Sequence, residues 1–283
     1  MARNKRTVAV TGASGFVGRY LVERLLAEGQ YEVRCLVRPY TDLSPLTKLS
    51  GDLDFFYGDI TRPESLAPAF EGAWGVVNLA GCREFWNRRR QHFYDLNENG
   101  ARNVFEACLA AGVEKVVQVS TPLAYGSPEH TPFDETTAAG PHASDYARSK
   151  YLGDQAGWQL YESAGLPLTI VHLAAVIGAG DDKATMEVRR AVEGKLPALV
   201  GADTTYTYLY VRDAADAIAR ALQKKDAVGR SYLIGNQRAT TREYFNTIGE
   251  LAGVKIPSLN IPEAWLFPVA RGMEMAARIT GKR

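Results

Sequence analysis

The sequence predicts an α/β fold, a doubly wound parallel sheet followed by a smaller C-terminal lobe. Short apolar runs alternate with helix-like segments through the first two thirds of the 283 residues. These runs are continuous Val, Ile and Leu stretches, which are typical of strands covered by helices on both faces. Strand–helix alternation at this spacing joins parallel strands through helical crossovers, so we expect helices on both sides of one sheet.

The elements follow one another in regular order. We expect strands at 7–11, 31–38, 52–59, 75–81 and 114–121, with a sixth beginning at 166. We expect helices at 15–29, 65–72, 91–112 and 144–165. After residue 178 the pattern loosens into a helix near 183–194, a strand near 206–211 and helices near 212–223 and 240–252. The sequence therefore predicts a first domain over 1–175 and mainly a second lobe over 176–283. A return of 206–235 to the first domain stays open.

The composition argues against several classes of protein. A net charge of +1 gives no electrostatic signal for nucleic acid or an acidic membrane. The three cysteines are typical of reduced thiols in a cytoplasmic protein. We see no signal peptide and no span of about 20 apolar residues. The four histidines lack metal-ligand spacing, so we expect no metal.

The first strand runs directly into the turn TGASGFVG, which holds Gly12, Gly15 and Gly18. Glycine tolerates a positive φ and has no Cβ to block a close ligand. The helix that follows offers free N–H groups and a positive dipole end to phosphates. A glycine turn between the first strand and first helix of an alternating chain predicts a Rossmann-type dinucleotide site.

The end of the second strand distinguishes NAD from NADP. A carboxylate there would bind the ribose 2′-hydroxyl of NAD. This chain has Arg38 at that place and no acid until Asp42. A guanidinium suits a 2′-phosphate and can stack on adenine, so we expect NADP(H) rather than NAD(H). The alternative is that Arg38 is a solvated strand end.

The stretch SDYARSKY places Tyr146 four residues before Lys150 on a predicted helix, so both lie on one face. Such a pair arises easily by chance, and its position gives it meaning. The preceding strand ends in Ser120 and Thr121, at the sheet edge where the cofactor is expected. An ammonium beside a phenol lowers the phenol's pKa, which lets the tyrosine exchange a proton with a carbonyl or alcohol.

Several motifs in order make the chain resemble an extended short-chain dehydrogenase/reductase of the NAD-dependent epimerase/dehydratase family. They are TGASGFVG, GDI at 58–60, NLAG at 78–81, NENGARNV at 97–104, VSTPLAYG at 119–126, YARSK at 146–150 and VIGAGD at 176–181. The resemblance implies that Thr121, Tyr146 and Lys150 form the catalytic set. It implies a cofactor set of Gly12, Ser14, Gly15, Phe16, Val17, Gly18, Arg38, Asp59, Ile60, Leu79, Ala80, Gly81, Asn97, Tyr146 and Lys150.

Two branches of that family compete. The segment 189–200 and the tail 263–283 resemble the dihydroflavonol-reductase-like and hopanoid-associated branch, which implies an NADP(H)-dependent carbonyl reductase or alcohol dehydrogenase. The alternative is an NAD-dependent sugar-nucleotide epimerase or dehydratase. Such enzymes usually carry an arginine where this chain has Thr204, Thr205 and Tyr206, and another where it has His172. Both departures weaken the nucleotide-sugar interpretation.

The substrate side is weakly marked. Arg83, Phe85 and Trp86 follow the fourth strand and are candidates for the pocket mouth, with His172 as a further substrate candidate. An equally good interpretation of 83–87 is a packed loop. The resemblance also implies a homodimer formed through the helices at 91–112 and 144–165.

Overall fold

A computed structural model describes residues 5–84, 86–130, 132–262 and 265. The chain forms two compact units, described separately here. The first unit combines Met1–Ala174 with Val211–Ile234, and the second combines Ala175–Tyr210 with the chain from Gly235. Residues 211–234 thus belong to the first unit, and the strand before them belongs to the second.

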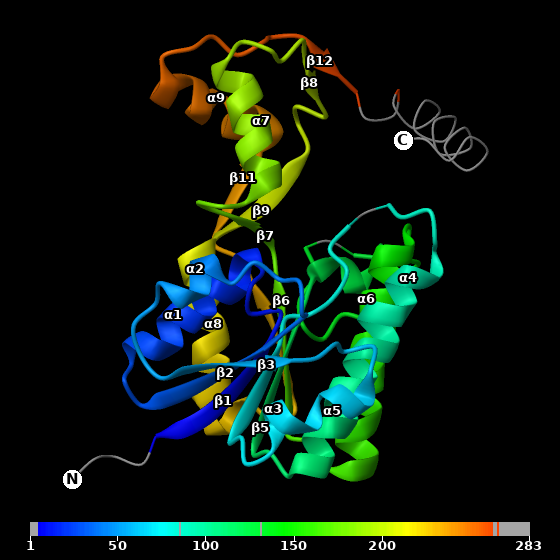
Figure 1. The fold of residues 1–283 in the computed structure, drawn as a ribbon. Helices are drawn as coiled ribbons and strands as arrows, with labels where there is room; N and C mark the ends of the chain where they lie inside the picture. Colours follow the sequence, from blue (N-terminus) through cyan, green and yellow to red (C-terminus); the bar gives the residue numbers. More distant parts are fainter. Residues whose placement is uncertain (1–4, 85, 131, 263–264, 266–283) are drawn as a thin grey trace. The chain divides into compact units, whose positions relative to one another are not determined.

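The first unit is built on one parallel sheet with the strand order β10-β6-β5-β4-β1-β2-β3 (Figure 1). Its strands are β1 (Arg6–Thr11), β2 (Tyr31–Val37), β3 (Leu53–Tyr57), β4 (Gly75–Asn78), β5 (Lys115–Ser120), β6 (Leu168–Leu173) and β10 (Arg230–Ile234). The order reverses between β1 and β4, both of which pair in parallel. The α/β, Rossmann-type doubly wound sheet is therefore confirmed, and a ligand is expected at this reversal.

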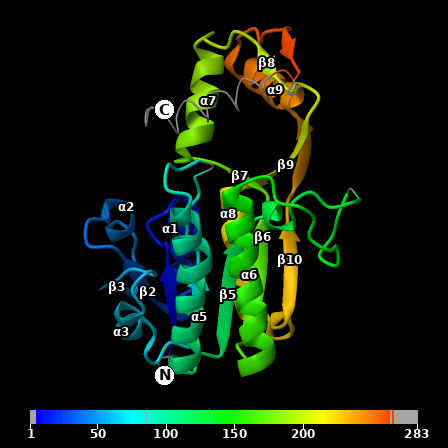
Figure 2. The ribbon, with the colours of Figure 1, turned by 90° about the vertical axis from the view of Figure 1, so that its right-hand side faces the viewer.

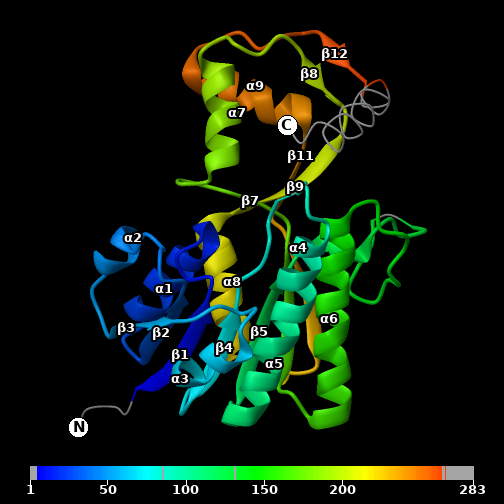
Figure 3. The same cartoon turned by 45° about the vertical axis from the view of Figure 1, so that its right-hand side comes forward.

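Helices cover both faces of the sheet. Figure 2 looks onto the face covered by α5 and α6, and Figure 3 shows α1 and α8 on the other side. The α-helices of the unit are α1 (Phe16–Ala27), α2 (Ser44–Thr47), α3 (Ala67–Phe70), α4 (Gln91–Tyr94), α5 (Gly100–Ala111), α6 (Asp145–Ala164) and α8 (Val211–Gln223). Shorter turns are η1 (Pro63–Ser65), η3 (Pro122–Tyr125) and η4 (Lys225–Ala227), and η2 (Asp95–Asn99) is a π-helical segment.

Local chemistry explains the boundaries. The side chain of Ser144 accepts a hydrogen bond from Ala147 N and starts α6, and Gly165 ends the helix with φ 71°. The helix expected at 65–72 is shorter than predicted, because prolines at 63 and 68 favour a 3₁₀ turn followed by a separate short helix. The helix expected at 91–112 is present but contains the π-helical turn.

The core lies between the sheet and its helices. Phe70, Phe105 and Leu168 are fully buried on the face covered by α3, α5 and α6. Gly157 of α6 lies against this core, since a Cβ there would come within 2.8 Å of Leu168 Cδ2 and 3.0 Å of Phe105 Cε2. This close approach fixes α6 over β5 and β6.

The described part of the second unit holds a three-stranded sheet, a two-stranded parallel sheet formed by β8 and β12, and two helices. Its strands are β7 (Ala175–Ile177), β8 (Leu199–Val200), β9 (Thr205–Tyr210), β11 (Gln237–Thr240) and β12 (Asn260–Ile261). Its helices are α7 (Asp182–Val192) and α9 (Thr241–Ala252). The order β11-β9-β7 is mixed, since β9 pairs antiparallel with β11 and parallel with β7. A capping box of Thr240 and Glu243 starts α9.

Candidate active site

The glycine turn after β1 has the backbone geometry of a phosphate-binding loop. Gly12 has φ 67°, and a Cβ there would lie 2.8 Å from Ala80 N and Leu79 C. A Cβ at Gly18 would lie 2.2 Å from the carbonyl oxygen of Gly12. Larger residues are therefore excluded at both positions. Gly15 is exposed and starts α1, so the helix N-terminus is open to a ligand.

The remaining candidates in this turn follow the glycines directly. Ser14, Phe16 and Val17 are half-buried around the start of α1. Phe16 packs edge-on against Tyr20, with ring centroids 6.1 Å apart. These residues lie where the pyrophosphate of a dinucleotide would meet the first turn of the helix.

Arg38 and Asp59 line one cavity of about 420 Å³ at the ends of β2 and β3. Asp59 Oδ1 accepts hydrogen bonds from the backbone N and Oγ1 of Thr61, at 2.9 and 2.8 Å. Ile60 is buried beneath Gly100, and its carbonyl accepts a 2.8 Å hydrogen bond from Asn103 Nδ2. The cavity also includes residues that the sequence did not mark: His92, Asp95, Leu96, Asn99 and Asn103.

A buried polar chain crosses the strands at the sheet reversal. Thr11 Oγ1 donates to Asn78 Oδ1 at 2.5 Å, and Asn78 Nδ2 donates to Gln118 Oε1 at 2.7 Å. Thr11 Oγ1 also accepts from Ala80 N at 3.1 Å. Leu79 and Ala80 thus continue β4 alongside the glycine turn. This contact holds the backbone that lines the expected dinucleotide site in place.

Thr121, Tyr146 and Lys150 come together in the first unit. Thr121 follows β5, and its hydroxyl lies close enough to the phenol of Tyr146 to act on the pKa of that phenol. Lys150 lies one turn further along α6 and is 8% exposed. Its Nζ donates to Val119 O at 2.9 Å, so the ammonium is held against the end of β5.

The electrostatics of Tyr146 differ from the sequence expectation. Burial raises the pKa of Tyr146 to about 12, although the Thr121 hydrogen bond acts to lower it. Burial also lowers the pKa of Lys150, against the opposing charge of Asp154. In the ligand-free chain the phenol is therefore a weaker acid than an ordinary tyrosine. The positive charge of an oxidised nicotinamide would favour the phenolate.

Asn97 lies in the π-helical turn and is 2% exposed. Its Oδ1 accepts from Cys82 N at 2.8 Å, and its Nδ2 donates to Ser149 Oγ at 2.9 Å. Gly81 and Gly153 leave room for Asn97. A Cβ at Gly81 would lie 2.7 Å from Asn97 Oδ1, and a Cβ at Gly153 would lie 2.1 Å from the carbonyl oxygen of Asn97. Asn97 therefore ties the loop after β4 to the helix that carries Tyr146 and Lys150.

The weak substrate candidates are spread out. Arg83 is exposed, Trp86 is half-buried, and Phe85 lies outside the described residues. His172 is 4% exposed in β6, where its ring nitrogens lie 3.2 Å from Thr121 O and 3.3 Å from Ser231 Oγ. These contacts give His172 an interior position behind the Thr121 segment.

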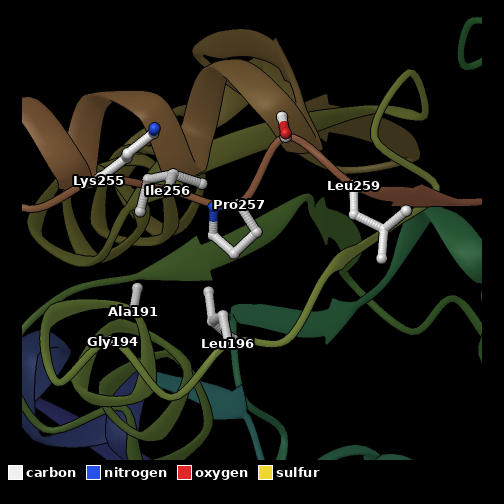
Figure 4. Close-up of a pocket in the computed structure, with 8 residues that line it drawn as sticks. Ala191, Gly194, Leu196, Lys255, Ile256, Pro257 and Leu259 are labelled. Carbon is white, nitrogen blue, oxygen red and sulfur yellow. The ribbon is translucent and has the colours of Figure 1, made fainter.

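A second cavity lies within the second unit. Figure 4 shows residues of α7 and the loop after it facing the segment before β12 across this cavity of about 310 Å³. Its lining residues are Ala191, Gly194, Leu196, Lys255, Ile256, Pro257, Ser258 and Leu259. The lining mixes backbone, aliphatic and two polar side chains, and it contains none of the residues that the sequence marks as catalytic.

The described residues fit a nicotinamide dinucleotide. Gly12 and Gly18 occupy positions that a Cβ would fill, and the cavity with Arg38 lies at the adjacent strand ends. None of the helices in the described part of the chain combines the length and apolar character that crossing a bilayer requires.

Comparison with known proteins gives consistent results. Residues 8–235 match the NAD dependent epimerase/dehydratase family. Sterol demethylase protein B of Methylococcus capsulatus is 29% identical over 93% of this chain and 80% of its own length. The 3β-hydroxysteroid-dehydrogenase/decarboxylase isoform 1 of Arabidopsis thaliana is 25% identical over 99% of this chain and 69% of its own.

Solved structures agree with the fold. The crystal structure of gox2253 superposes with a TM-score of 0.84 at 32% identity, covering 99% of this chain and 84% of the other. The chain therefore belongs to the NAD-dependent epimerase/dehydratase family, and it is an enzyme of the extended short-chain dehydrogenase/reductase class that binds a nicotinamide cofactor.

Proposed function

We propose that the chain is an NADP(H)-dependent oxidoreductase that reduces a carbonyl of a small organic substrate, or oxidises the corresponding alcohol. The observation that carries this proposal is the proximity of the Thr121 hydroxyl to the phenol of Tyr146, with Lys150 one turn away on α6. A hydroxyl, a phenol and an ammonium at the end of one parallel strand form a set that can hold an oxygen and move a proton.

Each residue has one task in this proposal. A bound NADPH would supply the hydride that reaches the carbonyl carbon. Thr121 donates a hydrogen bond to the substrate oxygen, and Tyr146 gives that oxygen its proton as the carbon–oxygen double bond becomes single. Lys150 stabilises the phenolate that is left, and it is placed for this by its hydrogen bond to Val119 O.

Arg38 supports NADP over NAD. It is exposed, it lines the cavity at the ends of β2 and β3, and β2 ends without a carboxylate. A 2′-phosphate would gain a charge-assisted hydrogen bond from its guanidinium, whereas a 2′-hydroxyl would lack its usual carboxylate partner.

The relatives support alcohol and carbonyl chemistry. One of them bears the name of a hydroxysteroid dehydrogenase, and we infer a similarly apolar hydroxy or keto compound for this chain. Residues 176–283 are then mainly the substrate-binding part. We also propose a cytoplasmic homodimer that uses the helices within 91–112 and 144–165, which light scattering of the purified protein would test.

Turnover by variants tests the proposal. A panel of aliphatic, aromatic and steroidal ketones and aldehydes is offered with NADPH and with NADH. Tyr146→Phe should reduce turnover by roughly a hundredfold or more, since it removes the proton donor. Tyr161→Phe, on the same helix and 37% exposed, is the matched control.

Two results would count against the proposal. Full turnover by Tyr146→Phe would remove the mechanism. Retention of tightly bound NAD through purification, with no net consumption of NADPH and with conversion of a nucleotide sugar, would establish the epimerase alternative instead.

A further inference from the structure

A group of buried polar side chains lies behind the proposed proton-transfer set. Asp154 of α6 is 4% exposed, and Ser120 of β5 and His172 of β6 are 6% and 4% exposed. Ser120 Oγ donates to Asp154 Oδ2 at 2.5 Å, and His172 Nδ1 lies 3.8 Å from the same oxygen. We call Ser120, Lys150, Asp154 and His172 the Asp154 cluster. A carboxylate so far from water requires compensation by charge or hydrogen bonds.

The cluster leaves one carboxylate oxygen without a donor. Asp154 Oδ1 is buried and has no hydrogen-bond partner among the described residues. The short bond from Ser120 is typical of a hydroxyl that donates to an ionised carboxylate. Burial raises the pKa of Asp154, whereas the charges of His172 and Lys150 and the hydrogen bond from Ser120 act to lower it and so favour the carboxylate.

His172 contributes little positive charge. Its Nδ1 faces the carbonyl oxygen of Thr121, which only accepts, so Nδ1 carries the proton. Its Nε2 then accepts from Ser231 Oγ as a neutral imidazole. Burial lowers the pKa of His172, against the charge of Asp154, which agrees with this neutral form.

Lys150 then supplies the positive charge of the cluster. It lies four residues before Asp154, so the two side chains leave α6 on the same face. Among the residues that the structure describes, Asp154 is the group whose charge acts to hold the pKa of Lys150 up against burial. The charge of Asp154 also acts to raise the pKa of Tyr125 and Tyr146, and the charge of Glu135, in the loop before α6, acts on His172.

We propose that Asp154 is a positioning residue, the buried counter-ion that keeps Lys150 in its ammonium form and, through Ser120 and His172, fixes the segment that carries Thr121. This inference rests on the proposed function only in the role given to Lys150, which is to stabilise the phenolate of Tyr146. This role needs no contact of Asp154 with substrate or cofactor. Asp154 acts through the charge of Lys150 and through the backbone at the end of β5.

The charge state of Lys150 can be measured without any substrate. Full-length protein is prepared with isotope-labelled lysine, and the Cε chemical shift of Lys150 is followed by NMR against pH. The resonance is assigned by its loss in Lys150→Arg. In Asp154→Asn we expect Lys150 to titrate about one to three pH units lower than in the unmodified chain. Glu162→Gln, an exposed acid on the same helix, should leave the titration unchanged.

A second variant covers the case in which Asp154→Asn does not fold. Ser120→Ala keeps the carboxyl but removes its donor, which favours protonated Asp154 and should shift the Lys150 titration in the same direction by less. Asp154→Glu should restore part of the original titration. A Lys150 titration that stays in place or moves upward in Asp154→Asn, or in Ser120→Ala if the first is unfolded, overturns the proposal.

Turnover separates the two proposals. If Tyr146→Phe is fully active while Asp154→Asn shifts Lys150, the proposed function fails and the counter-ion role stands. If Tyr146→Phe is inactive while Lys150 titrates normally in folded Asp154→Asn, the counter-ion role fails alone. With both correct, Asp154→Asn lowers kcat, and the alkaline rise of alcohol oxidation moves to higher pH because the phenolate has lost its ammonium.

Discussion

The hydroxyl of Thr121, after the end of β5, lies close enough to the phenol of Tyr146, in the first turn of α6, to lower the pKa of that phenol against the effect of burial. The Thr121 hydroxyl also accepts from Leu123 N at 3.4 Å, which orients it at the start of η3. In the short-chain dehydrogenase/reductase pattern that the sequence resembles, serine usually holds the place of Thr121. What the site requires is a hydroxyl held in this direction, and threonine supplies it.

Changing that hydroxyl should separate chemistry from shape. Thr121→Val keeps the volume and removes the donor, so we expect turnover to fall by roughly a hundredfold. Thr121→Ser keeps the hydroxyl and should stay within about threefold of the original rate. Steady-state kinetics with NADPH and an accepted ketone measure both. Equal rates for the Val and Ser variants would show that Thr121 does not bind the reacting oxygen.

Cofactor choice should depend on Arg38. Arg38→Ala removes the proposed partner of the 2′-phosphate, and we expect the Kd for NADPH to rise roughly tenfold or more while that for NADH changes little. Fluorescence titration measures both constants. Arg220→Ala on α8, with a side chain that is 75% exposed, is the control. Tenfold tighter binding of NADH than NADPH by the unmodified chain would contradict the assignment.

Asn97 should matter for stability as well as for the site. Asn97→Ala leaves Cys82 N without its acceptor and Ser149 without its donor, both in the interior. We expect the free energy of unfolding to fall by about 1–3 kcal/mol. Asn99→Ala removes an exposed amide from the same π-helical turn and should cost far less. Chemical denaturation without cofactor compares the two variants. Equal losses of unfolding free energy would argue against the role of Asn97 in tying the loop after β4 to α6.

Stability should fall in strong alkali for an identifiable reason. Burial raises the pKa of Tyr146 and of Tyr244 to about 12, above the usual value of about 10. Each phenol therefore stabilises the folded chain fully below about pH 10, and this contribution is lost as pH rises toward 12. The decline in unfolding free energy between pH 10 and 12 should be smaller for Tyr146→Phe and Tyr244→Phe. An unchanged decline in both would show that other groups cause it.

The sequence predicts the parts of the site that local pattern controls. Gly12 and Gly18 follow from a turn between a buried strand and an amphipathic helix, and the structure shows the close backbone contacts that require glycine. Tyr146 and Lys150 follow from helical spacing beside a strand end. These features need only neighbours in the chain.

Other parts of the site could not be predicted from the sequence, because they depend on contacts between segments that are distant in the chain. Asp154 looks like an ordinary helical acid in the sequence, and only the packing of α6 on β5 and β6 reveals its burial. His172 stays a substrate prediction that comes from its place in a family pattern, and only the fold shows its contacts with Thr121, Ser231 and Asp154. The π-helical turn around Asn97 also has no clear local signal, since its helical periodicity continues across it. For Asp154, the one local signal in the sequence is its place four residues after Lys150 on the same helix.

The order of the strands bears on how the chain is made. β10 completes the parallel sheet beside β6, yet in the chain β6 and β10 are separated by β7, α7, β8, β9 and α8. During synthesis the edge of β6 must therefore wait, with unpaired backbone groups, until residues 230–234 have emerged. Chaperone dependence and aggregation of nascent chains should accordingly be greatest for fragments that end between β6 and β10.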